Sequence, residues 1–485
     1  MHIVCIGAGP AGLTAAYQLT KAGCRVTVLE KDPVYVGGIS RTVRYKGFGF
    51  DIGGHRFFSK SPEIEQLWEE ILGDDFLQRP RKSRIYYGGK FYPYPLKGWQ
   101  TLRQMGAVAS IACVLSYLRA RLSPIPAPQN FEDWVINHFG RRLYGIFFKT
   151  YTEKVWGMDC REISVDWAAQ RIKGLSLSSA ILHMLPFKRP QSGSGVIKTL
   201  IHTFRYPRQG PGMMWEKAAA LVRRQGGEVL QGAEVEHLVH PADGQWEITY
   251  RGKDYQACRI TADYVIASLP LRELVAMIEP PLPEEARRAA GELRYRDFLI
   301  VALVVRDKNV FDDNWIYIHD PGVKVGRIQN FKAWSPELVP DPALNCYGME
   351  YFCFEGDGLW NSPDQQLIEL ARSELIRLKL ADGGDIVDGT VVRQAKAYPV
   401  YDQGYAERVK IIRRALERHC PRLYPVGRAG MHKYNNQDHA MMTAMLAARN
   451  ILAGEEIYDV WNVNQDAEYH EEASGAVRAV PQRAA

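Results

Sequence analysis

Three glycines between two short apolar runs, at the start of the chain, constrain the fold more than any other feature. The first run is His2 to Ile6, Gly7-Ala-Gly-Pro-Ala-Gly12 follows it, and a helical pattern then continues through Leu19. A second apolar run occupies Arg25 to Glu30. Strand, glycine turn, helix and strand in this order predict a Rossmann-type βαβ unit, and therefore an α/β domain built on a parallel sheet.

The same glycines indicate what this unit binds. Gly7 permits a tight turn, Gly9 lets a pyrophosphate approach the backbone, and Gly12 allows close packing of helix on strand. The helix that begins near Ala11 directs free N–H groups at phosphate oxygens. Glu30 ends the second strand, where a carboxylate accepts hydrogen bonds from ribose hydroxyls and argues against a 2′-phosphate. The sequence therefore predicts a dinucleotide site.

Length, charge and cysteine usage narrow the class of protein. A chain of 485 residues is too long for one hydrophobic core, so more than one domain is expected. The net charge of +6 is modest, and no basic run is interleaved with aromatic residues, so we expect no binding to nucleic acid. The eight cysteines include no C-x-x-C pair, and the chain opens directly into a strand without a signal peptide. These features predict a cytoplasmic protein with reduced thiols.

The order of the predicted elements indicates that the domains are interleaved. A mostly helical stretch follows the βαβ unit, strands dominate the middle of the chain, and a last strand and helix return near the C-terminus. We predict an α+β protein overall, with a discontinuous dinucleotide domain formed by 1–80, 212–280 and 420–456. A mainly helical substrate or lid domain is expected at 81–211 and an antiparallel-sheet substrate domain at 281–419. Residues 472–485 are expected to form a disordered tail.

The most apolar stretch, Ala107 to Leu118, has two interpretations. It is too short to span a bilayer, and Arg119 and Arg121 follow it. A core or lid helix is the favoured interpretation, and a surface for peripheral membrane contact is the alternative.

Three further motifs resemble the superfamily of flavin-dependent amine oxidases and protoporphyrinogen oxidases. They follow the glycine turn in the superfamily's order: Gly37-Gly-Ile-Ser-Arg41 with Phe50-Asp-Ile-Gly-Gly-His55, then Ala262 to Pro270, then Tyr424-Pro-Val-Gly-Arg-Ala-Gly430 with Asp438-His-Ala440. The resemblance implies that the dinucleotide is FAD rather than NAD. In the superfamily, the last motif places a helix N-terminus at the flavin pyrimidine, where it stabilises negative charge on the reduced ring.

Carried over to this chain, the resemblance implies a set of cofactor-binding residues and no metal site. These residues are Gly7, Gly9, Pro10, Ala11, Gly12, Glu30, Lys31, Gly38, Ser40, Arg41, Gly54, Val235, Gly427, Arg428, Asp438, His439 and Ala440.

A narrower resemblance, to the UDP-galactopyranose mutases, covers most of the chain. It rests on runs at Gly54-His-Arg-Phe-Phe-Ser59, Tyr92-Pro-Tyr-Pro95, Tyr151-Thr-Glu-Lys-Val-Trp-Gly157, Phe204-Arg-Tyr-Pro207, Trp315-Ile-Tyr317, Gly326-Arg-Ile, Trp334-Ser-Pro336 and Asn436-Gln-Asp-His439. One position departs from the family, because the mutases carry a tyrosine where this chain has Trp334.

The mutase resemblance implies a reaction and a set of roles. Mutases interconvert pyranose and furanose forms of a nucleoside-diphosphate sugar through an adduct at N5 of reduced FAD, and NAD(P)H is a candidate reductant. Arginine binds phosphate oxygens in a bidentate manner, which suits a departing diphosphate. The implied catalytic residues are Arg205, Arg327, His55, Tyr317 and Tyr434. The implied substrate-binding residues are Trp156, Trp315, Tyr405, Trp334 and Asn436.

An oxidoreductase is the alternative function. Tyr398 to Val409 also resembles the segment that protoporphyrinogen oxidase-like proteins place before their last strand. Such an enzyme would pass a hydride from an apolar or amine substrate to the flavin. The sequence leaves open the sugar, its carrier, the electron donor and the oligomeric state.

Overall fold

A five-stranded parallel sheet forms the first part of the molecule. The computed structural model describes residues 1–94, 96, 98–163, 165, 203–240, 244–402 and 404–463. The sheet has the order β20-β13-β1-β2-β9, with bounds Leu423–Pro425, Tyr264–Ala267, His2–Ile6, Arg25–Glu30 and Glu228–Gln231. Its central strands follow the predicted βαβ unit, so the α/β architecture is confirmed.

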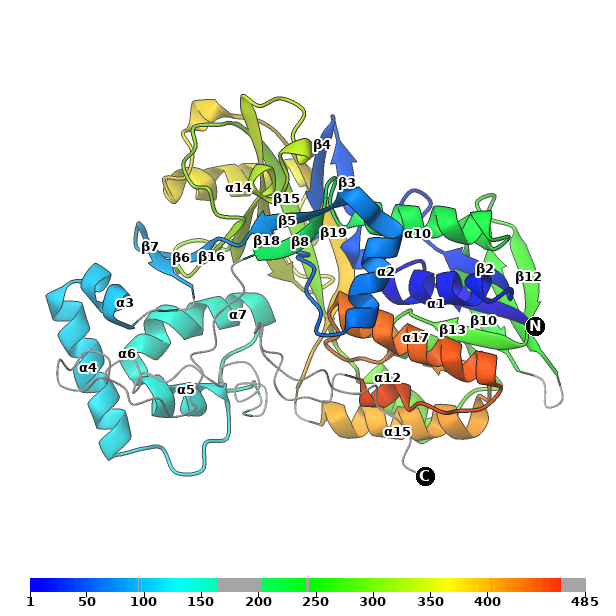
Figure 1. Ribbon diagram of the computed structural model, residues 1–485. Coiled ribbons are helices and arrows are strands. Elements are labelled where there is room, and N and C mark those ends of the chain that lie inside the picture. The colour runs from blue at the N-terminus through cyan, green and yellow to red at the C-terminus, as the bar shows by residue number, and fades with distance from the viewer. Residues whose placement is uncertain are drawn as a thin grey trace.

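Alternation along β1 gives this sheet two buried faces. Ile3 and Cys5 point to one core, and Val4 and Ile6 point to the other. The first face is covered by helices α1, α10 and α17, with α2 lying against α10 and α17: Pro10–Lys21, Gly212–Arg224, Gln437–Ala453 and Pro62–Leu72 (Figure 1). The covering helices come from distant parts of the sequence, so this domain is discontinuous.

The second face is covered by a small sheet and three helices. The sheet has the order β12-β11-β10-β14, with bounds Ala257–Ala262, Trp246–Arg251, Glu234–Val239 and Ile278–Glu279. The helices are α11, α12 and α15, with bounds Leu271–Met277, Glu284–Gly291 and Tyr405–His419. Ala286, Ala289, Ile412 and Leu416 of the last two helices share a core with Val4.

A seven-stranded, mostly antiparallel sheet forms the second part of the molecule, at the top of Figure 1. Its order is β19-β15-β18-β17-β16-β6-β7, with bounds Ile386–Pro399, Tyr295–Arg306, Leu344–Cys353, Arg327–Asn330, Trp315–Ile318, Ser83–Tyr87 and Lys90–Pro93. Helix α14 (Asp364–Arg377) packs against β15 and β19. Ten consecutive residues of β15 pair with β18, which makes this pair of strands the rigid centre of the sheet.

A helical region forms the third part, at the left of Figure 1. It contains α3, α4, α5, α6, a π-helical turn and α7, with bounds Gly98–Met105, Ala107–Leu122, Phe131–Phe139, Arg141–Tyr144, Gly145–Lys149 and Thr150–Trp156. Phe131, Val135 and Phe147 are among the buried residues of its separate core. No helix of the described residues is long and apolar enough to cross a membrane.

Short elements join these parts. Hairpin β3–β4 (Thr42–Tyr45 and Phe48–Asp51) follows the dinucleotide unit, and β5 (Phe76–Pro80) pairs with β8 (Thr203–Pro207). Helices α13 and α16 span Phe331–Trp334 and Gly427–Gly430.

The structure differs from the predicted domain bounds in two places. Strands β6 and β7 fall within 81–211, the range predicted as mainly helical, but they extend the edge of the seven-stranded sheet. Helices α12 and α15 fall within 281–419 but pack on the dinucleotide domain. The predicted tail at 472–485 lies outside the described residues.

Candidate active site

The glycine turn after β1 leaves no room for side chains. Gly7 has a φ of 96°, and its N–H donates to the Leu29 carbonyl at 2.8 Å. A Cβ at Gly12 would lie 1.9 Å from the Gly7 carbonyl oxygen. Helix α1 therefore packs on β1 at a distance that only glycine permits. Gly9 provides no side-chain cap for α1, so the first N–H groups, including that of Ala11, have no side-chain acceptor.

Glu30 is fixed at the carboxyl end of β2. Its carboxylate is 8% exposed and accepts hydrogen bonds from the Ala8 N–H at 2.7 Å and the Asp32 N–H at 2.9 Å. Burial raises the pKa of Glu30, and the two N–H donors act against that rise. Lys31, the next residue, is exposed. The predicted contact of Glu30 with ribose stays a prediction.

The second glycine cluster lies beside the first. The Gly37 N–H donates to the Ala8 carbonyl at 2.7 Å, and a Cβ at Gly9 would lie 3.9 Å from the Gly38 Cα. Ser40 is buried at the end of this turn. The Arg41 guanidinium donates to the Gly38 carbonyl at 2.9 Å and reaches Gln394 of the seven-stranded sheet at 2.6 Å.

The C-terminal motif adds a second helix N-terminus. Asn436 precedes α17 without a side-chain cap, so the N–H groups of its first turn have no side-chain acceptor, as in α1. Asp438 in that turn is buried, and its Oδ1 has no hydrogen-bond donor among the described residues, although His439 Nδ1 lies 3.9 Å away. A Cβ at Gly427 would lie 3.0 Å from the Ala11 Cβ, so the C-terminal motif meets the start of α1.

These features fit FAD. Two uncapped helix starts and bare glycine backbone suit a pyrophosphate, and a buried carboxylate oxygen without a hydrogen-bond donor among the described residues suits a polar group of the cofactor. Val235 is buried in β10, where the register with β11 shifts between Val235 and His237. The roles of the individual cofactor residues, including Pro10, His439 and Ala440, stay predictions.

A buried ion pair lies at the centre of the neighbouring sheet. Arg327 of β17 donates through Nε to Glu350 of β18 at 2.5 Å, and the Glu350 side chain has no exposed surface. Gln329 donates to the other Glu350 oxygen at 2.7 Å, and Trp334 Nε1 donates to Gln329 at 2.9 Å. Each member of this chain of hydrogen bonds fixes the next, so the position of Arg327 is well defined.

Arg327 keeps its charge in this setting. Burial is the largest influence and acts to lower the pKa of its guanidinium, but Glu350 and the neighbouring tyrosines together outweigh burial and hold the pKa well above its ordinary value. Of the three guanidinium nitrogens of Arg327, only Nε forms a hydrogen bond with a described residue. The N–H groups of both terminal nitrogens therefore remain available to a ligand. A buried cation with free donors can bind a phosphate or carboxylate.

Tyrosines from five elements or loops surround Arg327. Tyr317 of β16 lies between Tyr94 and Tyr151, at ring-centroid distances of 4.7 and 5.4 Å. Tyr398 and Tyr434 stack at 5.7 Å, and the Arg428 guanidinium lies over both rings. We call Arg327, Tyr94, Tyr151, Tyr317, Tyr398 and Tyr434 the arginine–tyrosine cluster. Phenol hydroxyls beside a guanidinium provide several hydrogen-bonding groups for an anionic, polar ligand.

His55 connects the cofactor side to this cluster. A Cβ at Gly53 would lie 3.7 Å from Arg327 Nη2 and 3.8 Å from His55 Nε2. His55 Nε2 donates to the Ile52 carbonyl at 2.7 Å. Burial, with the charges of Arg428 and Arg327, lowers the pKa of His55 to about 4, so its imidazole is neutral at pH 7. A Cβ at Gly54 would lie 3.1 Å from Gln329 and 3.4 Å from Trp334, so this loop also contacts the support of Arg327.

Arg205 does not join Arg327, contrary to the expected convergence of the two arginines. Its guanidinium pairs with Glu69 of α2 and lies 3.8 Å over the Phe76 ring. The neighbouring Phe204 and Tyr206 are buried on the opposite face of β8, where they contact Trp334. Because side chains alternate along a strand, Arg205 points away from that core.

The tryptophans predicted to bind substrate lie in cores. Trp334 is 1% exposed and stacks on Trp315 at 5.3 Å, and Trp156 is 7% exposed in the core of the helical region. Trp315 is 4% exposed, and its ring lies 6.3 Å from the ring of Tyr317 in the cluster. Trp334 therefore supports Gln329 and Gly54, and its predicted contact with substrate stays a prediction. A substrate role for Trp156 and Trp315 stays a prediction.

The two remaining predicted residues lie beside Tyr434. Tyr405 at the start of α15 stacks on Tyr401 at 4.3 Å, and the Tyr401 hydroxyl accepts the Tyr434 N–H at 2.5 Å. Asn436 follows two residues later and precedes α17.

Sequence reasoning missed Glu350 and Tyr398. A charged residue inside the apolar strand Tyr347 to Phe354 was the available signal for Glu350, because a carboxylate buried in a sheet needs a cationic partner. Tyr398 begins the segment Tyr398 to Val409, but the resemblance of that segment to protoporphyrinogen oxidase-like proteins implies no role for this tyrosine.

Comparisons with known proteins agree with the fold. The family model of flavin-containing amine oxidoreductases matches residues 10–452. A probable UDP-galactopyranose mutase of Klebsiella pneumoniae is 27% identical over 171 residues, which cover 33% of this chain and only 42% of that protein. A coproporphyrinogen III oxidase of Propionibacterium freudenreichii is 24% identical and covers 87% of this chain and 85% of its own length. A crystal structure of reduced UDP-galactopyranose mutase superposes with a TM-score of 0.80 at 22% identity, over 96% of this chain and 97% of its own.

Proposed function

Because the chain belongs to the family of flavin-containing amine oxidoreductases and is an FAD-dependent enzyme, we propose that it isomerises a sugar carried on a nucleoside diphosphate. The observation that carries this proposal is Arg327, a largely buried cation with 18% of its side chain exposed, whose terminal nitrogens have no acceptor among the described residues. An apolar or amine substrate would gain nothing from a buried cation. A diphosphate would provide the missing acceptors.

Reduced FAD would supply the electron pair that attacks the anomeric carbon. In the proposal, Arg327 holds the phosphate leaving group, so that it remains bound while its bond to the sugar is open. Tyr317 and Tyr434 donate hydroxyl hydrogen bonds to the same phosphates, and neutral His55 borders the flavin without adding positive charge. The proposal assigns no phosphate contact to Arg205, because its side chain pairs with Glu69.

An oxidoreductase is the second candidate, and a specific finding favours it. The match to the coproporphyrinogen III oxidase spans most of both chains, whereas the sequence match to the Klebsiella mutase spans a third of this one. In that case the arginine–tyrosine cluster would bind a carboxylate of the substrate, the substrate would pass a hydride to the flavin, and oxygen or another acceptor would reoxidise the flavin in each turnover.

A comparison of oxidised and dithionite-reduced enzyme on a panel of sugar nucleotides separates the two candidates. The proposal expects new sugar-nucleotide isomers, resolved by chromatography, with the reduced enzyme alone and without net electron consumption. NADH and NADPH should each be tried as the reductant. Stoichiometric hydrogen peroxide or acceptor reduction during turnover, with no isomer formed, would instead establish the oxidoreductase.

A further inference from the structure

Helix α4 carries an apolar stripe on the face that it turns to solvent. Its members are the exposed residues Val108 (85%), Ile111 (61%), Leu115 (60%), Leu118 (47%) and Leu122 (86%). At about 100° per residue, they fall within an arc of about 80° over the whole length of the helix. The buried residues of α4, Cys113, Tyr117 and Ala120, lie on the opposite side. Single exposed apolar residues are ordinary, but a continuous stripe marks an interaction surface.

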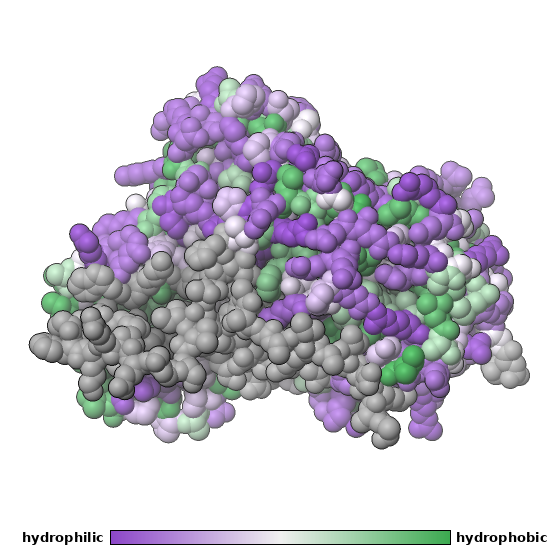
Figure 2. Space-filling view, in the orientation of Figure 1, coloured by the Kyte–Doolittle hydropathy of each residue, from purple (hydrophilic) through white to green (hydrophobic). Residues whose placement is uncertain are grey.

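The stripe lies on the outside of the molecule. Figure 1 places α4 at the outer left edge of the helical region, away from both sheets. In the same orientation, Figure 2 shows hydrophobic side chains at the left and lower left edge of the molecule. None of the residues of the arginine–tyrosine cluster belongs to α4.

The charge on α4 and next to it along the chain is positive. Residues 98–131 contain Arg103, Arg119 and Arg121 and no aspartate or glutamate, and the first carboxylates after them are Glu132 and Asp133 of α5. Arg119 and Arg121 lie on either side of the stripe at its C-terminal end, and both are exposed. Within the described part of the chain, neither of them forms an ion pair, and the same holds for Arg103 and Arg142. These four arginines therefore present positive charge that no ion pair of the described residues neutralises.

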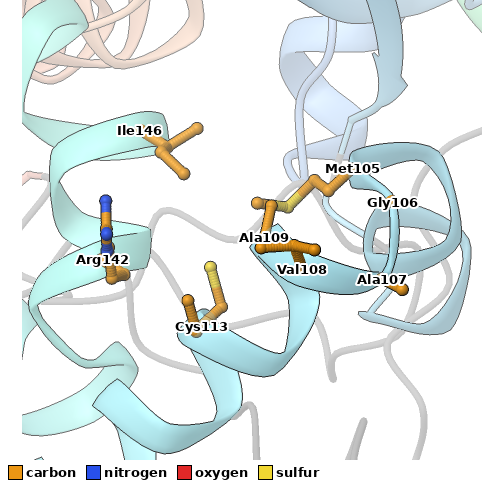
Figure 3. Close-up of a pocket in the computed structure, with 9 residues that line it drawn as sticks. Met105, Gly106, Ala107, Val108, Ala109, Cys113, Arg142 and Ile146 are labelled. Carbon is orange, nitrogen blue, oxygen red and sulfur yellow. The ribbon is translucent and has the colours of Figure 1, made fainter.

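A cavity of about 480 Å³ adjoins the stripe at Val108. Figure 3 shows that its walls are mostly small or apolar side chains of α4, with Ile146 and Arg142 on the facing segment. The lining contains no acidic residue. An apolar hollow with one arginine at its wall matches the chemistry of an acyl chain and its anionic headgroup.

We propose that α4 is a peripheral docking surface for an anionic lipid bilayer. The stripe would lie at the boundary between headgroups and acyl chains, and the flanking arginines would bind anionic headgroups. Since no described helix can span a bilayer, the contact is one of docking onto the surface. The inference does not depend on the reaction proposed above.

A second copy of the chain is the less favourable occupant of this surface. The spacing of the stripe would also suit helix pairing, but paired helices normally place opposite charges beside their seam. Two copies of α4 would offer each other only arginines, because α4 has no acidic residue. An anionic surface neutralises these charges, and a second α4 does not.

Flotation of the full-length holoenzyme with lipid vesicles tests the proposal. We expect it to float with phosphatidylcholine vesicles that contain phosphatidylglycerol, to bind pure phosphatidylcholine much more weakly, and to be released by salt. The double variant Leu115→Glu/Leu118→Glu should lower the partition coefficient at least about tenfold. The double variant Arg119→Ala/Arg121→Ala should lower it by about fivefold for each charge removed.

Matched variants elsewhere show whether the effect belongs to this surface. Ile376→Glu changes an exposed apolar residue on α14, and Arg418→Ala removes an exposed arginine from α15; both should bind vesicles as the wild type does. Flavin absorbance and thermal unfolding of each variant confirm folding. Wild-type protein that fails to float, or stripe variants that float normally, would overturn the proposal. A dimer in sedimentation that Leu115→Glu/Leu118→Glu dissociates, without any vesicle binding, would overturn it in favour of a second copy.

Discussion

Arg327 and Glu350 are direct partners across neighbouring strands and are joined by a 2.5 Å hydrogen bond in the interior of the seven-stranded sheet. The strand register places the two Cα atoms opposite each other, so the backbone itself brings the charges together. Glu350 uses both oxygens, one for Arg327 and one for Gln329. The carboxylate therefore anchors one side of the guanidinium and leaves the other side free for a ligand.

Loss of the Glu350 carboxylate should destabilise the protein strongly. In Glu350→Ala, Arg327 becomes a buried charge without a counterion, which costs about 3–5 kcal/mol of the free energy of unfolding. Urea denaturation followed by flavin fluorescence measures this loss. Glu337→Ala is the matched control, since it removes a carboxylate from more exposed pairs with Arg208 and Arg79, which are worth at most about 1 kcal/mol. Equal losses of unfolding free energy in the two variants would show that the Arg327–Glu350 pair stabilises the protein no more than an exposed ion pair does.

Replacement of Arg327 by lysine should separate binding from stability. Arg327→Lys keeps a cation beside Glu350 but loses the planar fork that binds two phosphate oxygens. We expect kcat/KM for the sugar nucleotide to fall about 10- to 150-fold, which corresponds to about 1.5–3 kcal/mol for a hydrogen bond to a charged group. The flavin spectrum should not change.

Arg205→Lys is the control for that experiment. Its guanidinium pairs with Glu69 at the surface, so the variant should retain kcat/KM within about twofold, as exposed ion pairs contribute little. If Arg205→Lys is impaired as strongly as Arg327→Lys, the two arginines act together on the substrate, and the Glu69 pair must open during turnover.

The dinucleotide unit could be predicted from the sequence because its signals are local. The strand, the glycines and Glu30 lie within one stretch of chain, and each glycine has a steric reason that needs no distant partner. Gly12 shows this clearly, since the atom that excludes a side chain belongs to Gly7.

The substrate side could be predicted only in part, because its contacts connect distant residues. Strand β6 pairs with β16, which lies more than two hundred residues further along the chain. The local sequence of β6 therefore did not indicate that this strand belongs to the edge of a sheet. Arg205 alternates with buried Phe204 and Tyr206, so its direction relative to them was predictable. Which face of β8 meets Trp334 depends on tertiary packing, and the sequence does not show that.

Gly12→Ala should prevent the enzyme from holding FAD. The new methyl group would lie 1.9 Å from the Gly7 carbonyl oxygen, so α1 must move away from β1 and from the pyrophosphate site. We expect purified Gly12→Ala to lack the flavin absorbance bands and to unfold at a lower temperature. Gly291→Ala is the control, because no atom lies within 4 Å of the added Cβ. It should retain flavin and gain up to about 1 kcal/mol from helix propensity. Full flavin occupancy in Gly12→Ala would contradict the tight-turn argument.

Because of His319, the free energy of unfolding should be lower in mild acid than at neutral pH. Its side chain is 4% exposed and stacks on Tyr151 at 4.9 Å, and burial, together with the charge of Lys154, lowers the pKa of His319 from 6.5 to about 3. The unfolded chain therefore binds a proton that the folded protein does not bind between about pH 6.5 and pH 3. Stability from this residue is complete above pH 6.5 and declines as the pH falls, by about 2 kcal/mol at pH 5.

The variant His319→Gln isolates this contribution from that of other histidines. Burial also lowers the pKa of His55 and His432, each to about 4, so the wild type has several sources of acid sensitivity. Both groups are present in wild type and variant, and their effects cancel when the two proteins are compared. Urea denaturation at pH 7 and pH 5 should show a loss on acidification that is smaller by about 2 kcal/mol in His319→Gln. The exposed His419→Gln should keep the wild-type loss. If His319→Gln loses as much stability as wild type, the imidazole is already solvated in the folded state, and its close stacking on Tyr151 does not persist in solution.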